Sequence, residues 1–213
     1  MKSLELQVDD LHQAYRQWAG EPVFVSTFRR ENRLPVSFEA LDVLCYRSGD
    51  EDRLRAEDEF TFLVTAGLSL QETDDPIGRV ELVWRLQGRR TWQEIQALAE
   101  ALAAIAVLPQ YGPVRFAPGA VIRNISLPIF DRMDSLLITH WGVHSPEYLP
   151  GLQPPVLLLS IKALFGSEAA IVEQIGPEEA CRRFLLEELD WDAPDRKCAG
   201  LDCEGTEAKS SLS

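Results

Sequence analysis

The chain has 213 residues, of which 46% are hydrophobic and 26% charged, so it is long and apolar enough to bury the core of one domain. Its 34 acidic and 21 basic residues give a formal net charge of −13, which disfavours nucleic acids and anionic membranes as partners and favours a cationic partner or none that depends on charge. No stretch has the length and hydrophobicity of a signal peptide or a bilayer-spanning helix, so we expect a cytoplasmic protein.

The first predicted element is a helix over residues 4–19, where apolar residues recur at helical spacing until Gly20 and Pro22 end the pattern. Two strands are predicted next, at residues 24–28 and 40–46. A charged connector over residues 50–59 follows, with six acidic residues and two arginines, and its composition predicts a solvated loop or short helix.

Residues 60–66 alternate in hydrophobicity and predict a strand with one buried face, which Gly67 ends. Residues 79–86 alternate again, and this pattern places Trp84 inward and Glu81 outward. Thr91 and Glu94 have the spacing of a capping box, which predicts that a helix begins there and continues to Pro109.

Three further strands are predicted at residues 120–125, 136–141 and 156–161. The last begins with a continuous apolar run, which is typical of a central strand covered on both faces. Ser167 is placed to cap a short helix that ends before Gly176, and Pro177 begins another that continues to Leu189. Small and polar residues predominate beyond Asp192 and predict a flexible tail.

Together these elements predict an α+β (mixed α/β) fold, in which helices flank a mostly antiparallel or mixed central sheet. We expect residues 1–58 to supply a helix and strands that pack on the core, residues 59–191 to form the main domain, and residues 192–213 to form the polar tail.

Candidate catalytic groups have structural explanations at this level. The segment around Ser69 lacks the second glycine of a nucleophile elbow, because Gln71 stands in its place. His140 and His144 on an extended strand would lie about 13 Å apart, too far to share a metal ion, unless Gly142 folds the chain back. We therefore expect no catalytic residues, metal or cofactor; a small hydrolase or metal-dependent enzyme using Ser69, His140 and His144 is the alternative.

The four cysteines show no framework spacing. Cys45 and Cys181 lie in apolar segments, whereas Cys198 and Cys203 lie in the polar tail. We interpret all four as reduced thiols of a cytosolic protein.

Several short motifs form an ordered series between residues 60 and 189. They are Thr65-Ala66-Gly67-Leu68-Ser69, Arg79-Val80-Glu81-Leu82, the amphipathic helix from Trp92 to Pro109, Ala117-Pro118-Gly119, Leu136-Leu137, Ser167-Glu168 and Ile175-Gly176. In order and spacing this series resembles the Suppressor of Fused domain.

The resemblance implies a mixed α/β domain without catalytic activity. The eukaryotic regulator of this family holds a transcription factor by adding a peptide strand between this kind of domain and a second, C-terminal domain, and shorter prokaryotic relatives are thought to include immunity proteins against toxins. The segment after Leu189 is too short for that second domain. The two-domain clamp and its contact residues are therefore not transferred to this chain.

These observations predict a non-enzymatic protein-binding module, of immunity or regulatory type, whose partner is another protein such as a cationic toxin or regulator. A structural subunit of a larger assembly is a further possibility. The acidic connector is the first candidate surface, an aromatic rim after the strand at 136–141 is the second, and an exposed sheet edge is another route to a peptide. The candidate residues are Asp50, Glu51, Asp52, Glu57, Asp58 and Glu59 in the connector, and Trp141, His144 and Tyr148 in the rim.

Overall fold

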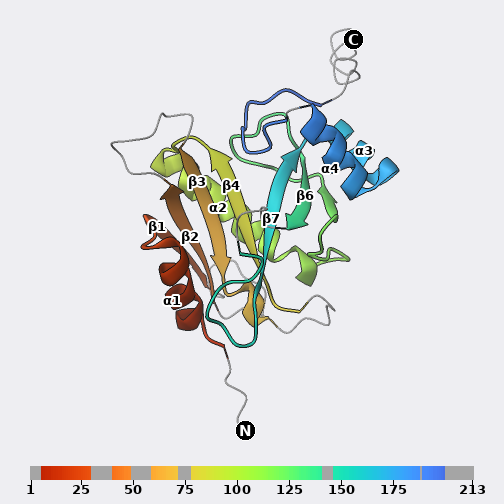
Figure 1. Cartoon of the computed structure of the whole chain (residues 1–213). Helices are drawn as coiled ribbons and strands as arrows, with labels where there is room; N and C mark the ends of the chain where they lie inside the picture. Colours follow the sequence, from red (N-terminus) through yellow and green to blue (C-terminus); the bar gives the residue numbers. More distant parts are fainter. Residues whose placement is uncertain are drawn as a thin grey trace.

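The computed structural model describes residues 6–29, 40–48, 59–71, 78–140, 146–187 and 189–199. Within these ranges seven strands form one sheet in the order β1-β2-β3-β4-β7-β6-β5 (Figure 1). The strands are β1 (Phe24–Arg29), β2 (Ala40–Ser48), β3 (Phe60–Ala66), β4 (Val80–Gln87), β5 (Val121–Arg123), β6 (Ser135–His140) and β7 (Leu157–Leu164). The helices are α1 (Val8–Ala19), α2 (Trp92–Ala106), α3 (Gly166–Ile175) and α4 (Pro177–Leu186), with short 3-10 turns η2 (Leu68–Leu70) and η3 (Leu108–Gln110).

The sheet is mixed, as predicted. Neighbouring strands run antiparallel except for β4 and β7, which are parallel. The connection between these two strands contains α2, β5 and β6, as a parallel pair requires a long crossover. Strands β1 and β2 belong to the same sheet as the rest, so the N-terminal elements are part of the main domain's architecture.

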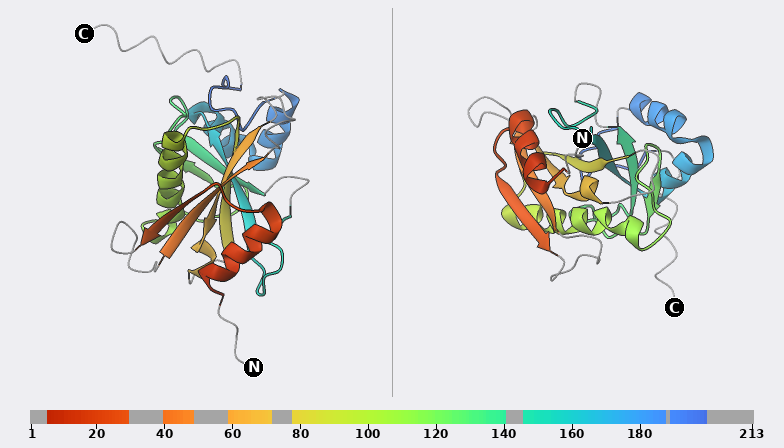
Figure 2. Two further views of the ribbon diagram at one scale, coloured as in Figure 1. Left: turned by 90° about the vertical axis from the view of Figure 1, so that its left-hand side faces the viewer. Right: turned by 90° about the horizontal axis from the view of Figure 1, so that it is seen from below.

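Helices cover both faces of the sheet (Figure 2). Helix α2 packs one face through Ile95, Leu98 and Leu102, and α1 packs the other through Leu11 and Tyr15. Helices α3 and α4 lie on the α1 side and pack against Leu137 and Leu164. The central strands are therefore buried on both faces, which explains the continuous apolar run of β7.

Two expectations about the central strands were wrong for this reason. Strand β3 buries both of its faces rather than one. Glu81 is fully buried rather than outward, because α1 covers the face of β4 that the alternating pattern assigned to solvent. Alternation within one strand cannot distinguish a solvated face from a face covered by a distant helix.

The predicted starts of two helices had different outcomes. The capping box at α2 is confirmed, since Thr91 Oγ1 accepts from the Glu94 N–H at 3.3 Å and the Glu94 carboxylate accepts from the Thr91 N–H at 2.7 Å. Ser167 does not cap α3, because that helix begins one residue earlier and the Glu168 carboxylate accepts from the Phe165 N–H at 3.1 Å.

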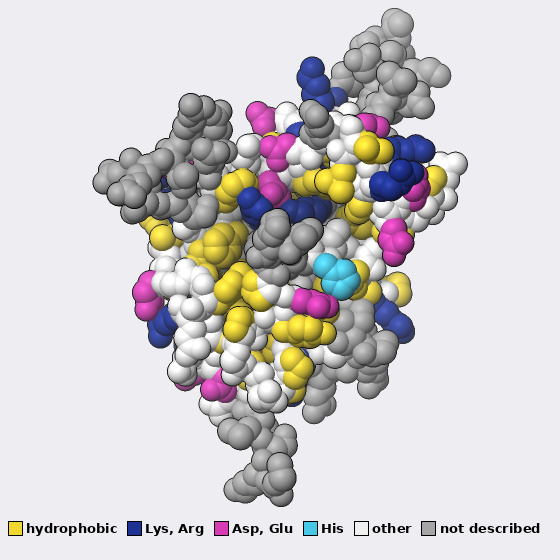
Figure 3. All heavy atoms as spheres, viewed as in Figure 1, with side chains coloured by type: hydrophobic (Ala, Val, Ile, Leu, Met, Phe, Trp, Pro, Cys, Tyr) yellow, Lys and Arg dark blue, Asp and Glu magenta, His cyan; other side chains and the backbone are white. Residues whose placement is uncertain are grey.

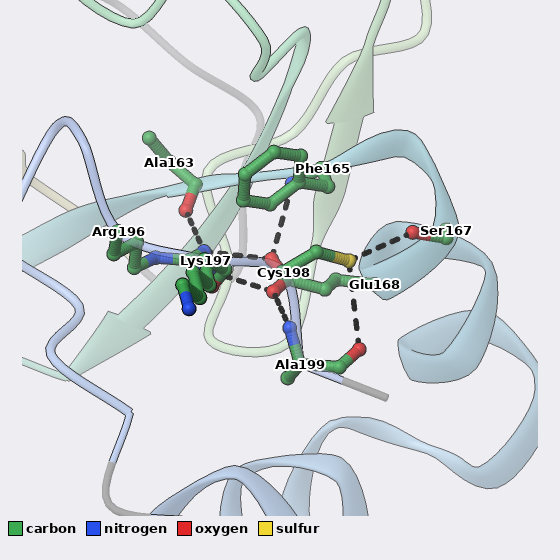
Figure 4. A network of polar contacts seen from close by, with 8 residues as sticks. All are labelled: Ala163, Phe165, Ser167, Glu168, Arg196, Lys197, Cys198 and Ala199. Carbon is green, nitrogen blue, oxygen red and sulfur yellow. Dashed lines mark hydrogen bonds and ion pairs between the residues drawn. The ribbon is translucent and has the colours of Figure 1, made fainter. Parts of the chain in front are cut away.

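The segment after α4 is anchored as far as Ala199 rather than flexible from Asp192. The Arg196 guanidinium donates to both oxygens of the buried Glu168 carboxylate at 2.6 Å, and the Ala199 N–H donates to the same carboxylate at 2.8 Å (Figure 4). Upstream, Asp192 pairs with Lys162 at 2.6 Å. Residues 200–213 of the expected tail lie outside the described residues.

The cysteines correct a further expectation. Cys45 and Cys181 are free, but Cys198 is disulfide-bonded. Burial raises the pKa of the Cys45 thiol to about 12, so this cysteine is an inert core residue.

Candidate functional site: the open edge of the sheet

Strand β1 is the outermost strand at one edge of the sheet. It pairs with β2 along six residues, and within the described part of the chain no strand pairs with its other side. Figure 2 (left) shows β1 facing the viewer with α1 and α2 to either side. Backbone N–H and C=O groups along such an edge are free to pair with another extended chain.

Half of the side chains in β1 are apolar, and the edge begins with two exposed valines. Val23 and Val25 are each 43% exposed on one side, while Phe24 and Phe28 pack against the core on the other. Arg29 is the one charged residue of the six in β1. Edge strands that avoid association usually carry lysines, prolines or bulges, so β1 lacks the usual protection along its length.

An exposed aromatic ring lies beside the edge. Trp92, the first residue of α2, is 56% exposed and its ring lies 6.1 Å from that of Phe24. The Arg47 guanidinium lies 5.2 Å from the Trp92 ring centroid, and its Nη2 donates to the Arg90 carbonyl at 3.0 Å. We define the β1 edge site as Val23, Phe24, Val25, Arg47 and Trp92. Tryptophan and arginine held in place at a surface are the residue types that most often dominate binding energy.

Of the nine predicted binding residues, only Glu59 and Tyr148 lie within the described part of the chain. Asp50, Glu51, Asp52, Glu57, Asp58, Trp141 and His144 lie outside the described residues. Glu59 is half-buried directly before β3, and its carbonyl accepts from the Gly88 N–H at 2.7 Å. Tyr148 is 46% exposed and forms an isolated bridge with Leu157.

The described members of the two predicted surfaces, Glu59 in one and Tyr148 in the other, lie at opposite ends of the sheet. Glu59 precedes Phe60, which pairs with the last residue of β4, whereas Leu157 pairs with the first. Seven steps along a strand separate these ends by about 23 Å. Glu59 is at the end that also carries Trp92, because Arg47 pairs with Thr61 in β3 and contacts the Trp92 ring.

The two described groups proposed for a hydrolase, Ser69 and His140, are not brought together. Ser69 is buried and donates through both Oγ (2.7 Å) and N–H (3.0 Å) to Glu81, which also accepts from Thr65 Oγ1 and the Gly67 N–H. His140 is exposed at the end of β6, and β7 and β4 separate that strand from β3, a distance of about 14 Å across three strand spacings. His144 lies outside the described residues.

Within the described residues, no group of three or more His, Cys, Asp or Glu side chains is arranged to hold a metal ion. The Glu81 carboxylate serves instead to join the turn after β3 to β4, and burial raises its pKa above the ordinary value although four hydrogen bonds oppose this shift. No helix in the same ranges is both long and apolar enough to cross a membrane.

Sequence reasoning did not identify the β1 edge site. The sequence pattern indicates Trp92 only as the first residue of a capped helix and Val25 only as a member of a strand, and it assigns Val23 to no element. The local signal for an open edge was the low charge of residues 23–28, but which strand lies at an edge depends on pairing between distant segments.

The seven-stranded mixed sheet, covered on both faces, defines a single α+β domain. A family model described as Suppressor of fused protein (SUFU) matches residues 38–197 of the chain. The chain belongs to this family, which confirms the resemblance seen in the motif series.

Solved structures share this fold. A SUFU homolog from Neisseria gonorrhoeae superposes with a TM-score of 0.59 at 16% identity, over 90% of this chain and 93% of that one. A chain of the Sufu–Fu complex gives a TM-score of 0.59 at 17% identity, over 89% and 88%. Drosophila Suppressor of Fused gives 0.59 at 16% identity, with 89% of this chain covering 49% of that one. No curated protein sequence matches the chain.

Proposed function

We propose that this protein is a non-enzymatic protein-binding module that takes up an extended segment of a partner at the β1 edge site. The observation that carries the proposal is a six-residue edge strand, nearly uncharged, with no described strand on its outer side and with the exposed Trp92 ring beside it. An added strand would gain backbone hydrogen bonds from β1 and bury the valines and Trp92. A family member of the same fold occurs in a complex, that of Sufu with Fu, which supports a binding role.

The partner we propose is a cationic protein, and the role is that of an immunity-type or regulatory protein in the cytoplasm that neutralises it. The net charge of −13 supports this choice. On the face seen in Figure 3, the described acidic side chains are scattered among basic ones. The densest acidic run in the sequence is the connector at 50–59. Ser48, which precedes it, and Glu59, its last residue, lie at the end of the sheet that carries Trp92.

The test requires a purified candidate partner, such as the product of a neighbouring toxin gene. The double variant Val23→Lys/Val25→Lys adds two charges to the edge, which discourages strand addition. The matched control is Leu185→Lys/Leu186→Lys on α4, since these leucines are 66% and 73% exposed. We expect the edge variant and Trp92→Ala to weaken binding at least about tenfold, as loss of a central anchor does, and the control to bind normally.

Hydrogen exchange provides a second readout, because strand addition protects the amides of β1. Unchanged affinity in both edge variants, with protection elsewhere, would refute the edge as the site. The charge component is tested separately by neutralising Asp50, Glu51, Asp52, Glu57, Asp58 and Glu59. If affinity and its dependence on salt do not change, the partner is not recognised through the acidic connector.

A further inference from the structure

A pocket of about 370 Å³ lies at the end of α2 opposite to Trp92. Three segments enclose it: the turn that follows β3, the start of β4, and the chain that follows α2 as far as Phe116. Its volume falls within the range of sites that hold small molecules. Leu68, Val80 and Phe116 contribute apolar surface to its wall, and both Leu68 and Phe116 are themselves buried in the core.

The described residues that line this pocket differ in charge from the chain as a whole. They include two arginines, Arg79 and Arg115, and no carboxylate, although the chain has a net charge of −13. Arg115 is exposed and makes no hydrogen bond or ion pair within the described part of the chain. Arg79 uses one N–H to donate to the Ser69 carbonyl at 3.1 Å, and a guanidinium has five N–H donors. The described lining therefore places guanidinium N–H groups that have no described protein acceptor beside an apolar wall.

The backbone around the pocket favours a singly charged anion over a phosphate. The N–H groups of Gly67 and Ser69, which could otherwise hold a phosphate, already donate to Glu81 at 3.0 Å each. The pocket also reaches Ala106, the last residue of α2, where the helix dipole is negative and opposes a dianion. A singly charged carboxylate suits the two guanidinium groups better, because its oxygens match the planar fork of an arginine.

We propose that this pocket binds a small organic carboxylate with a compact apolar body. The carboxylate pairs with Arg115 and Arg79, and the apolar body packs against Leu68, Val80 and Phe116. The pocket lies at the opposite end of α2 from the β1 edge site, so the proposal does not depend on the proposed partner.

Calorimetric titration of the full chain with three organic probes and with inorganic phosphate tests the chemistry. Isocaproate represents a free acid, N-acetyl-leucine represents the carboxyl end of a peptide, and N-acetyl-leucinamide is the neutral control. We expect at least one acid to bind about tenfold more tightly than the amide, as one charge-assisted hydrogen bond provides. If N-acetyl-leucine binds more tightly than isocaproate, the natural ligand is the carboxyl end of a peptide. If isocaproate binds equally or more tightly, the natural ligand is a free acid.

Variants locate the site. Arg115→Gln is expected to weaken the acid about tenfold, and Arg115→Lys to restore part of the loss, because it keeps the charge but not the fork. Arg183→Gln on α4, which also removes an exposed arginine, is the matched control and should bind normally. Amide NMR shifts should change at Val114 and Phe116 when the acid is added. The proposal is overturned by equal binding of acid and amide, by tighter binding of inorganic phosphate, or by an unchanged affinity in Arg115→Gln.

Discussion

Replacing Arg196 by methionine should destabilise the whole domain. The side chains of Arg196 and Glu168 are only 4% and 0% exposed, and the guanidinium joins both carboxylate oxygens at 2.6 Å and the Ala163 carbonyl at 2.9 Å (Figure 4). Methionine keeps the apolar stem but leaves Glu168 as a buried charge held by only the N–H groups of Phe165 and Ala199. Breaking one half of such a pair costs about 3–5 kcal/mol. For a chain of this size, that loss lowers the melting temperature by roughly 6–20 °C.

Urea unfolding followed by tryptophan fluorescence measures this loss directly, since Trp191 lies in the anchored segment and packs against Phe184. Arg182→Met is the matched control, because its pair with Glu179 is exposed and such pairs contribute about 0–1 kcal/mol. The double variant Glu168→Gln/Arg196→Met should recover part of the stability, because no buried charge then remains unpaired. A loss in Arg196→Met no larger than that in Arg182→Met would show that the segment through Ala199 does not contribute to the fold.

Three further predictions concern stability. Burial raises the folded-state pKa of Glu81. The contribution of Glu81 to the free energy of unfolding is therefore greatest below the ordinary pKa of 4.5 and falls as the pH rises through the folded-state pKa. Urea midpoints of the Glu81→Gln variant should lack this dependence on pH. Gly119→Ala should cost about 1–3 kcal/mol in thermal unfolding, because Gly119 has a φ of +89° and a Cβ there would lie 2.6 Å from Pro177 Cγ. Thr91→Ala should cost about 1 kcal/mol by removing the cap of α2, measured against exposed Gln93→Ala.

The strands and helices were largely predictable from the sequence because their signals are local. Alternation marked β3 and β4, and the capping box marked the start of α2. Glu81 shows where local reasoning ends. It interacts with Tyr15 of α1 and accepts from Ser69 beyond β3, and neither neighbour can be inferred from the pattern of β4 alone.

The prediction for the C-terminal segment was wrong for a similar reason. Its polar composition predicted a tail, yet Arg196 pairs with a glutamate 28 residues earlier in the chain. A polar residue in a loop has the same sequence signature whether it is solvated or paired with a buried carboxylate. Only the fold, which brings the start of α3 against residues 196–199, distinguishes the two.

Charge and shape make separable contributions to the proposed binding function. In the proposed function, the acidic residues of the connector act over about a Debye length and raise the rate of encounter with a cationic partner. Contacts at Val25 and Trp92 form only after docking, so they slow dissociation. Neutralising the connector should therefore lower the association rate and its salt dependence, whereas Trp92→Ala should raise the dissociation rate. If both changes altered the same rate constant, the connector and the β1 edge site would be one contact surface rather than a steering field and an anchor.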